Sequence, residues 1–95
     1  MRLIDNKEAL ELRLIDEEEN TLAWINYIDR REDVIELAHT TVSKGQEGKG
    51  IGREIILKTI DHARKHGLRL YPTCEFAIVV LNRMEGVEDV VLSNI

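Results

Sequence analysis

The sequence predicts an α+β fold in which an antiparallel meander of strands continues into a strand–helix–strand unit, so that helices pack on a mixed sheet. Two observations support this fold class. Three apolar segments, starting at residue 10, are separated by short and highly charged runs, as in strands joined by turns. After residue 50 the spacing of apolar residues lengthens to that of an amphipathic helix. A chain of 95 residues accommodates one domain of this kind, and we expect residues 1–95 to form it.

The first two predicted strands differ in how their apolar residues are spaced. Leucines at alternate positions, Leu10, Leu12 and Leu14, are separated by charged residues, which is typical of a half-buried strand. Residues 22–28 are apolar on both faces except at Asn26, which is typical of a strand in the middle of a sheet.

The third predicted strand covers residues 34–42 and has β-branched residues at both ends. Because side chains alternate along a strand, we expect Ile35, Leu37 and His39 to share one face. Short polar turns join the three strands, and they therefore predict an antiparallel meander.

A helix and a fourth strand complete the predicted unit. Ile56, Ile60 and Ala63 recur at helical spacing, so we expect a helix over residues 50–66 that ends at Gly67. Residues 68–71 form a short strand that Pro72 stops. We expect this strand to lie parallel to the third one, reached by a right-handed crossover. Residues 74–84 favour a second helix, although the β-branched run from residue 78 to 80 also suits a strand.

Charge and apolar content narrow the classes of function. The chain has 13 Lys and Arg against 18 Asp and Glu, a net charge of −5, whereas proteins that bind nucleic acid usually present a concentrated basic face. The longest apolar stretch, residues 76–81, is far shorter than the roughly 20 residues of a membrane span, and no basic and apolar leader precedes it. We therefore expect a cytoplasmic protein that binds a small molecule, with neither nucleic acid nor membrane as a partner.

Soft metal ligands are scarce in the sequence. Cys74 is the single cysteine, so an internal disulfide and a multi-cysteine zinc site are both excluded. His62 and His66 lie one helical turn apart, but no cysteine or carboxylate stands at a matching spacing. We therefore predict no metal site.

The glycines between the third strand and the helix are the most informative stretch of the chain. Gly48, Gly50 and Gly52 let a ligand approach the backbone closely, and the first turn of a helix offers unpaired N–H groups to an anion. The spacing fits neither a P-loop nor a dinucleotide fingerprint. The glycines therefore indicate either a phosphate-binding loop of another kind or a flexible turn.

Residues 47–53 resemble the acetyl-CoA diphosphate motif of the GNAT N-acetyltransferases, which has Gln or Arg, then two residues, then Gly-x-Gly or Gly-x-Ala. Residues 39–42 (His-Thr-Thr-Val) and 72–76 (Pro-Thr-Cys-Glu-Phe) also resemble a minimal GNAT type of roughly 100 residues that has His-Thr-x-Val and Pro-x-Cys-x-Phe at these places. The resemblance covers residues 34 to about 81. Glu47 departs from the motif, and this change should weaken binding without abolishing it, because the motif binds through backbone amides.

The resemblance implies that acetyl-CoA (CoA) is wedged between the third strand and the strand over residues 68–71. It assigns the diphosphate to the amides of the loop and first helical turn, and the pantetheine to the end of the third strand. Lys44, Lys49 and Arg53 are either additional phosphate contacts or solvated side chains. The cofactor-binding residues predicted in this way are Thr40, Thr41, Val42, Glu47, Gly48, Lys49, Gly50, Ile51, Gly52 and Arg53.

Two residues are candidates for the chemistry of acetyl transfer. The attacking amine must lose a proton, and His39 is the best acceptor by type and position, unless it is a structural histidine. The resemblance puts the acetyl group near Cys74, which can protonate the departing thiolate or accept the acetyl group itself, unless it is a small buried apolar residue. Many GNAT enzymes use a tyrosine on the following helix as the acid, and none stands between Glu75 and Gly86.

These observations favour a small N-acetyltransferase that transfers acetyl from acetyl-CoA to a small-molecule or peptide amine, by direct attack in a ternary complex. The alternatives are a non-catalytic acyl-CoA-binding module and an interaction domain without a cofactor. The identity of the acceptor and the oligomeric state are left open by the sequence.

Overall fold

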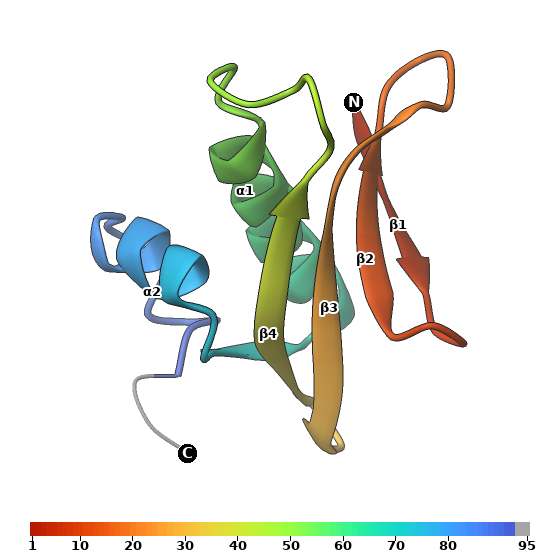
Figure 1. Ribbon diagram of the computed structural model, residues 1–95. Helices are drawn as coiled ribbons and strands as arrows, with labels where there is room; N and C mark the ends of the chain where they lie inside the picture. Colours follow the sequence, from red (N-terminus) through yellow and green to blue (C-terminus); the bar gives the residue numbers. More distant parts are fainter. Residues whose placement is uncertain (93–95) are drawn as a thin grey trace.

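The computed structural model describes residues 1–92, which form a five-stranded sheet with two helices. The strands lie side by side in chain order: β1 (Arg2–Asn6), β2 (Glu11–Ile15), β3 (Thr21–Arg31), β4 (Val34–Val42) and β5 (Arg69–Pro72). The first four pair antiparallel, and β5 pairs parallel to β4. Helix α1 (Ile51–His66) connects β4 to β5, and α2 (Glu75–Asn82) follows β5 (Figure 1). The predicted α+β class with a mixed sheet is confirmed.

The sequence patterns located four of the five strands and missed β1. β2, β3 and β4 form the predicted meander, with β3 in the middle of the sheet, and β5 follows the crossover helix. β1 is an edge strand whose residues alternate between exposed and half-buried, so it contributes only Leu3 to the margin of the core. With so little apolar surface to bury, its sequence carries only a weak strand pattern.

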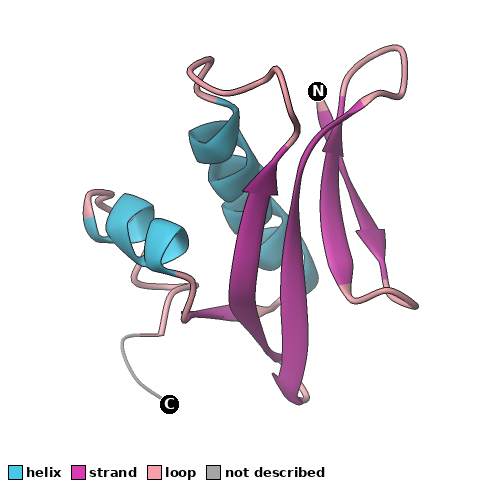
Figure 2. Ribbon diagram, viewed as in Figure 1, coloured by secondary structure: helices cyan, strands magenta, loops and turns pink. Residues whose placement is uncertain are grey.

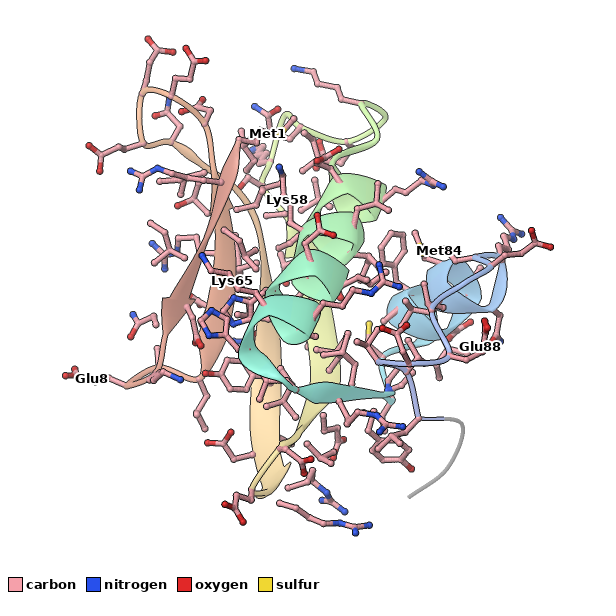
Figure 3. The ribbon with its side chains drawn as sticks, turned by 180° about the vertical axis from the view of Figure 1, so that it is seen from behind. Met1, Glu8, Lys58, Lys65, Met84 and Glu88 are labelled. Carbon is pink, nitrogen blue, oxygen red and sulfur yellow. The ribbon has the colours of Figure 1, made fainter. Side chains whose placement is uncertain are left out.

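Helix α1 covers one face of the sheet and supplies five buried residues of the core. It lies behind the strands in Figure 1 and in front of them in Figure 3, where Lys58 and Lys65 mark its course. Isoleucines at helical spacing face the sheet and are buried together with leucines of β2 and β4. The helix ends as predicted, because Gly67 adopts a left-handed conformation (φ 67°) and donates its amide to the carbonyl of Ala63.

The predicted second helix is confirmed as α2, which is short and weakly buried. Ala77 and Leu81 are its buried residues, whereas Phe76, Ile78 and Val79 are each more than a third exposed. The preference for a helix over a strand at residues 78–80 was therefore correct. Among residues 1–92, no helix has both the length and the apolar content that a membrane crossing requires.

The expectation that His39 shares a face with Ile35 and Leu37 is wrong. The pairing of β3 with β4 shifts register: Asn26 lies opposite His39, and the next residue, Tyr27, lies opposite Leu37. Ala38 is therefore an extra residue, a β-bulge, and it reverses the alternation of side chains beyond it. Leu37 is fully buried under α1, whereas His39 is exposed on the opposite face, which we call the bare face of the sheet.

Candidate functional site

The two neighbouring strands β4 and β5 separate halfway along β4. They pair only from Val34 to Leu37, where the Leu37 carbonyl accepts the amides of Thr73 and Cys74 at 3.1 and 2.9 Å. Beyond Leu37, β4 continues to Val42 with β3 on one side and no strand on the other within residues 1–92. The end of β4 is consequently an open strand edge inside the sheet.

Hydrogen bonding to β3 determines which β4 amides face this open edge. The Ser43 amide donates to the Leu22 carbonyl at 2.9 Å, so it points toward β3. Because amides alternate in direction along an antiparallel strand, the Thr41 amide also points toward β3, and the Thr40 and Val42 amides point toward the opening. Cys74 lies at this opening, since its sulfur lies 3.5 Å from the hydroxyl oxygen of Thr40, within hydrogen-bonding distance.

The loop that follows β4, residues 43–50, leads directly into α1 (Figure 2). Gly48 and Gly50 have φ angles of 77° and 76°, which lie in the left-handed region that other residues rarely adopt. A Cβ atom built on either glycine would meet nothing within 4 Å. The two glycines therefore serve the path of the loop and leave the space beside it open.

The start of α1 offers unpaired hydrogen-bond donors. Gly50 caps the helix without a side chain, and the first amide bonded to the turn is that of Glu54, which donates to the Gly50 carbonyl at 3.0 Å. The amides of Ile51, Gly52 and Arg53 precede it and have no intrahelical acceptor. Together with the positive end of the helix dipole, these three amides can bind an anion.

A groove of about 350 Å³ joins the loop, the start of α1 and α2. Seven of the ten predicted cofactor-binding residues line it: Val42, Glu47, Gly48, Gly50, Ile51, Gly52 and Arg53. Phe76 and Val80 of α2 and Gln46 of the loop also line the groove, and none of these three is among the predicted cofactor-binding residues. The signal for the first two was their spacing of four residues, which places both on one face of a helix.

The charges around the groove are mixed. The Glu47 carboxylate accepts the amide of Gly45 at 2.8 Å, so it is folded back onto the loop and brings a negative charge to the groove. Arg53 lines the groove and brings a positive charge. Lys44 and Lys49 are exposed on the loop and do not line the groove.

Cys74 lies at the open edge, where it caps the start of α2. Its thiol is half-buried and donates a hydrogen bond to the Thr40 hydroxyl, with 3.5 Å between sulfur and oxygen. Burial by itself raises the pKa of this thiol. The Thr40 hydroxyl and the nearby backbone amides of Ala77, Phe76 and Thr40 favour the thiolate and together outweigh burial, so the pKa of Cys74 is lower than its ordinary value.

His39 approaches the same open edge from the bare face of the sheet. It lies opposite Asn26, whose neighbours Ile25 and Tyr27 both point into the core, so Asn26 and His39 point away from it. No hydrogen bond joins His39 to Cys74 in the described part of the chain. The structure therefore brings Cys74 and Thr40 together and places His39 on the other side of the sheet.

Larger depressions lie nearer the C-terminus, but they lack the open strand edge. One of about 650 Å³ runs along the outside of α1 from Arg53 to Arg64 and is closed by residues 83–87. Another of about 670 Å³ is lined by β5, α2 and the segment from Met84 to Leu92. We assign the functional site to the smaller groove, because it alone combines unpaired amides with the free edge of β4 among the described residues.

A known protein family and a solved structure are similar to the chain over most of its length. The family model described as GCN5-related N-acetyl-transferase matches residues 11–90. The chain is similar to the solution structure of a GCN5-like candidate N-acetyltransferase from Staphylococcus aureus, with 28% identity, 96% of this chain and 87% of that chain covered, and a TM-score of 0.70.

Two further similarities are weaker. Structures of two variants of the BH1408 protein from Bacillus halodurans each share 20% identity over 68% of this chain. The matches cover 46% and 47% of the chains of these two variants, with TM-scores of 0.47 and 0.48. No curated protein sequence matches the chain.

Proposed function

The chain belongs to the GCN5-related N-acetyltransferase family, and from this premise we propose that it binds acetyl-CoA in the groove between α1 and α2 and transfers the acetyl group to an amine. The observation that carries the proposal is the combination of three unpaired amides at the start of α1 with an unpaired strand edge on β4. The amides can donate hydrogen bonds to a diphosphate, and the strand edge can pair with an extended chain that carries amide groups.

The residues present fit the diphosphate of acetyl-CoA. The amides of Ile51, Gly52 and Arg53 would donate to its oxygens, and the open space beside Gly48 and Gly50 admits it without a clash. The Arg53 guanidinium would add a charge-assisted contact. Glu47 opposes the anion, so we expect it to reduce the affinity, as the sequence already indicated.

The open edge of β4 would hold the pantetheine. The Val42 amide would pair with its amide groups as a neighbouring strand would, and Phe76 and Val80 form an apolar wall on the other side. Thr41 was also predicted to bind the cofactor. Its amide points toward β3, so only its side chain could contact the pantetheine. The acetyl group then comes to lie beside Cys74.

When bound, acetyl-CoA supplies an acetyl group activated as a thioester. His39 accepts the proton that the attacking amine must lose, from the bare face of the sheet. The Thr40 amide would stabilise the oxyanion that develops on the carbonyl oxygen when the amine attacks the thioester carbon. Cys74 transfers its proton to the departing sulfur, and a thiol whose pKa lies below its ordinary value does this more readily than an unperturbed one. Solvent then returns a proton to Cys74.

Binding and turnover test the proposal separately. Calorimetry with acetyl-CoA should show one binding site, and thiol release from acetyl-CoA should depend on the amine that is added. Binding without thiol release for any amine would identify an acyl-CoA-binding module, and the absence of binding would leave an interaction domain. Cys74→Ala and His39→Ala should each slow turnover and leave acetyl-CoA affinity nearly unchanged.

Initial-rate kinetics separate direct attack from an acetyl-cysteine route. Direct attack in a ternary complex predicts intersecting double-reciprocal lines when acetyl-CoA and the amine are both varied. Parallel lines, together with an acetyl group on Cys74 in mass spectra recorded without amine, would show instead that the cysteine accepts the acetyl group.

A further inference from the structure

The groove between α1 and α2 ends at a contact between two side chains. On β4 the groove is lined by Val42, and on α2 by Phe76 and Val80. Two residues before Val42 and Phe76 stand Thr40 and Cys74, whose Oγ1 and Sγ atoms lie 3.5 Å apart. Neither of them lines the groove, so their contact closes it where β4 approaches the start of α2. We call these two side chains the end wall.

The backbone on both sides of the end wall is held in place. The Cys74 amide donates to the Leu37 carbonyl at 2.9 Å, and the Cys74 carbonyl accepts the amide of Ile78 at 2.9 Å. Leu37 is fully buried in the core. On the other side, Thr40 pairs with Ile25, which is a fully buried residue of β3. The end wall therefore cannot retreat unless β4 or α2 shifts against the core.

The space between the two helices offers no other room for an acyl group near the end wall. A Cβ atom built on Gly52 would lie 2.6 Å from Cζ of Phe76, so the aromatic ring lies against the backbone of α1. In the proposed function the thioester carbonyl lies at the Thr40 amide, and the amine arrives from the bare face of the sheet. The tail of the acyl group would then point at the end wall.

We propose that the end wall limits the length of the acyl group, so that the protein selects acetyl-CoA over propionyl-CoA and longer acyl-CoA thioesters. Thr40 and Cys74 are then specificity-determining residues through their size, apart from any part in proton transfer. The acetyl methyl group would contact the end wall, and an added methylene group would have to displace closely packed atoms. This inference rests on the proposed function, because it concerns the acyl group of the same cofactor.

Calorimetry with acetyl-CoA, propionyl-CoA, butyryl-CoA and CoA tests the inference without turnover. One methylene group changes binding in a closed apolar pocket by about 10- to 200-fold, so propionyl-CoA should bind the unmodified protein at least about tenfold more weakly than acetyl-CoA. Butyryl-CoA should bind more weakly still. CoA carries no acyl group, so it reports on the rest of the groove and should bind every variant alike.

Three variants change the end wall. Cys74→Ala removes the sulfur and makes room for about one methylene group, so the ratio of the propionyl-CoA to the acetyl-CoA dissociation constant should fall about tenfold. Cys74→Ser is the matched control, because its hydroxyl keeps an atom in the end wall and should preserve the preference for acetyl. Thr40→Ala opens the end wall from β4 and should relax the preference as Cys74→Ala does. Circular dichroism shows that each variant is folded.

The four ligands separate failure of the inference from failure of the proposed function. Equal affinities of the unmodified protein for acetyl-CoA and propionyl-CoA would overturn the inference and leave the proposed function intact. Full retention of the acetyl preference in Cys74→Ala would also overturn it, as would an equal loss of preference in Cys74→Ser. If Cys74→Ala does not fold, Thr40→Ala decides in the same way. Absence of binding for all four ligands would remove the proposed function and the inference together.

Discussion

Placing a carboxylate at Gly50 is the sharpest perturbation of the proposed diphosphate site. Gly50 has a φ of 76° and caps α1, and a Cβ atom added there would meet nothing within 4 Å. Gly50→Asp therefore fits sterically and costs only left-handed backbone strain, which Asp and Asn bear better than other residues. Gly50→Asn has the same shape and similar strain without the charge, so it is the matched control.

The expected loss of affinity follows from electrostatics. At a separation of about 6 Å and an effective dielectric constant of about 40 to 80, one carboxylate and two phosphate charges repel by roughly 1.4 to 2.8 kcal/mol. This repulsion corresponds to a dissociation constant about 10- to 100-fold higher. The difference in acetyl-CoA affinity between the Asp and Asn variants isolates this electrostatic contribution, because the two variants carry similar backbone strain.

Isothermal titration calorimetry with acetyl-CoA measures the difference directly, and repeating it at high salt should reduce it. We expect Gly50→Asn to bind within a few-fold of the unmodified protein and Gly50→Asp to bind at least about tenfold more weakly than the Asn variant. Equal affinities for the Asp and Asn variants would show that no anion binds close to Gly50, which is contrary to the proposed diphosphate site.

Three further predictions concern single side chains. Glu47→Gln should tighten acetyl-CoA binding by about fivefold, the size of one like-charge repulsion of about 1 kcal/mol near the surface, and calorimetry would contradict this if affinity fell. Thr40→Val removes the hydroxyl that hydrogen-bonds the sulfur of Cys74, so the pKa of the thiol should rise. An unchanged pH dependence of Cys74 alkylation by iodoacetamide would count against this contact. Burial lowers the pKa of His62, in spite of the nearby Asp5 carboxylate. The unfolded chain therefore takes up this proton first as pH falls below about 6.5, and the native state loses stability over that range. The melting temperature should fall between pH 7 and pH 5, and more steeply than in His62→Gln; equal slopes would show that His62 does not titrate this way.

Local patterns were sufficient for the parts of the fold that bury a regular apolar face. α1 begins and ends within one residue of its predicted bounds, because isoleucines mark its buried side and glycines flank it on both ends. β1 was not predicted, because an edge strand that makes few contacts with the core needs no strong alternation of apolar and polar residues. The register of the strands could not be predicted either, because the bulge at Ala38 depends on how β3 and β4 pair and not on the sequence of either strand alone.

At the candidate site, too, features of a single segment could be predicted, whereas contacts between segments could not. The loop glycines and Cys74 were visible in the sequence because their residue types are chemically specific. The contact of Phe76 with Gly52, which joins two segments 24 residues apart, exists only once α2 has packed beside α1. The placement of His39 on the bare face likewise followed from the register shift, and no spacing rule along β4 predicts it.

Titration of isotope-labelled protein with acetyl-CoA, followed through the amide resonances, shows whether the diphosphate binds at the first turn of α1, because each backbone N–H is observed separately. We expect the largest changes at Ile51, Gly52 and Arg53, with downfield proton shifts as these amides gain acceptors, and further changes at Thr40 and Val42. Saturable changes confined to the outer groove between α1 and residues 83–87, with the first turn of α1 unmoved, would contradict this expectation.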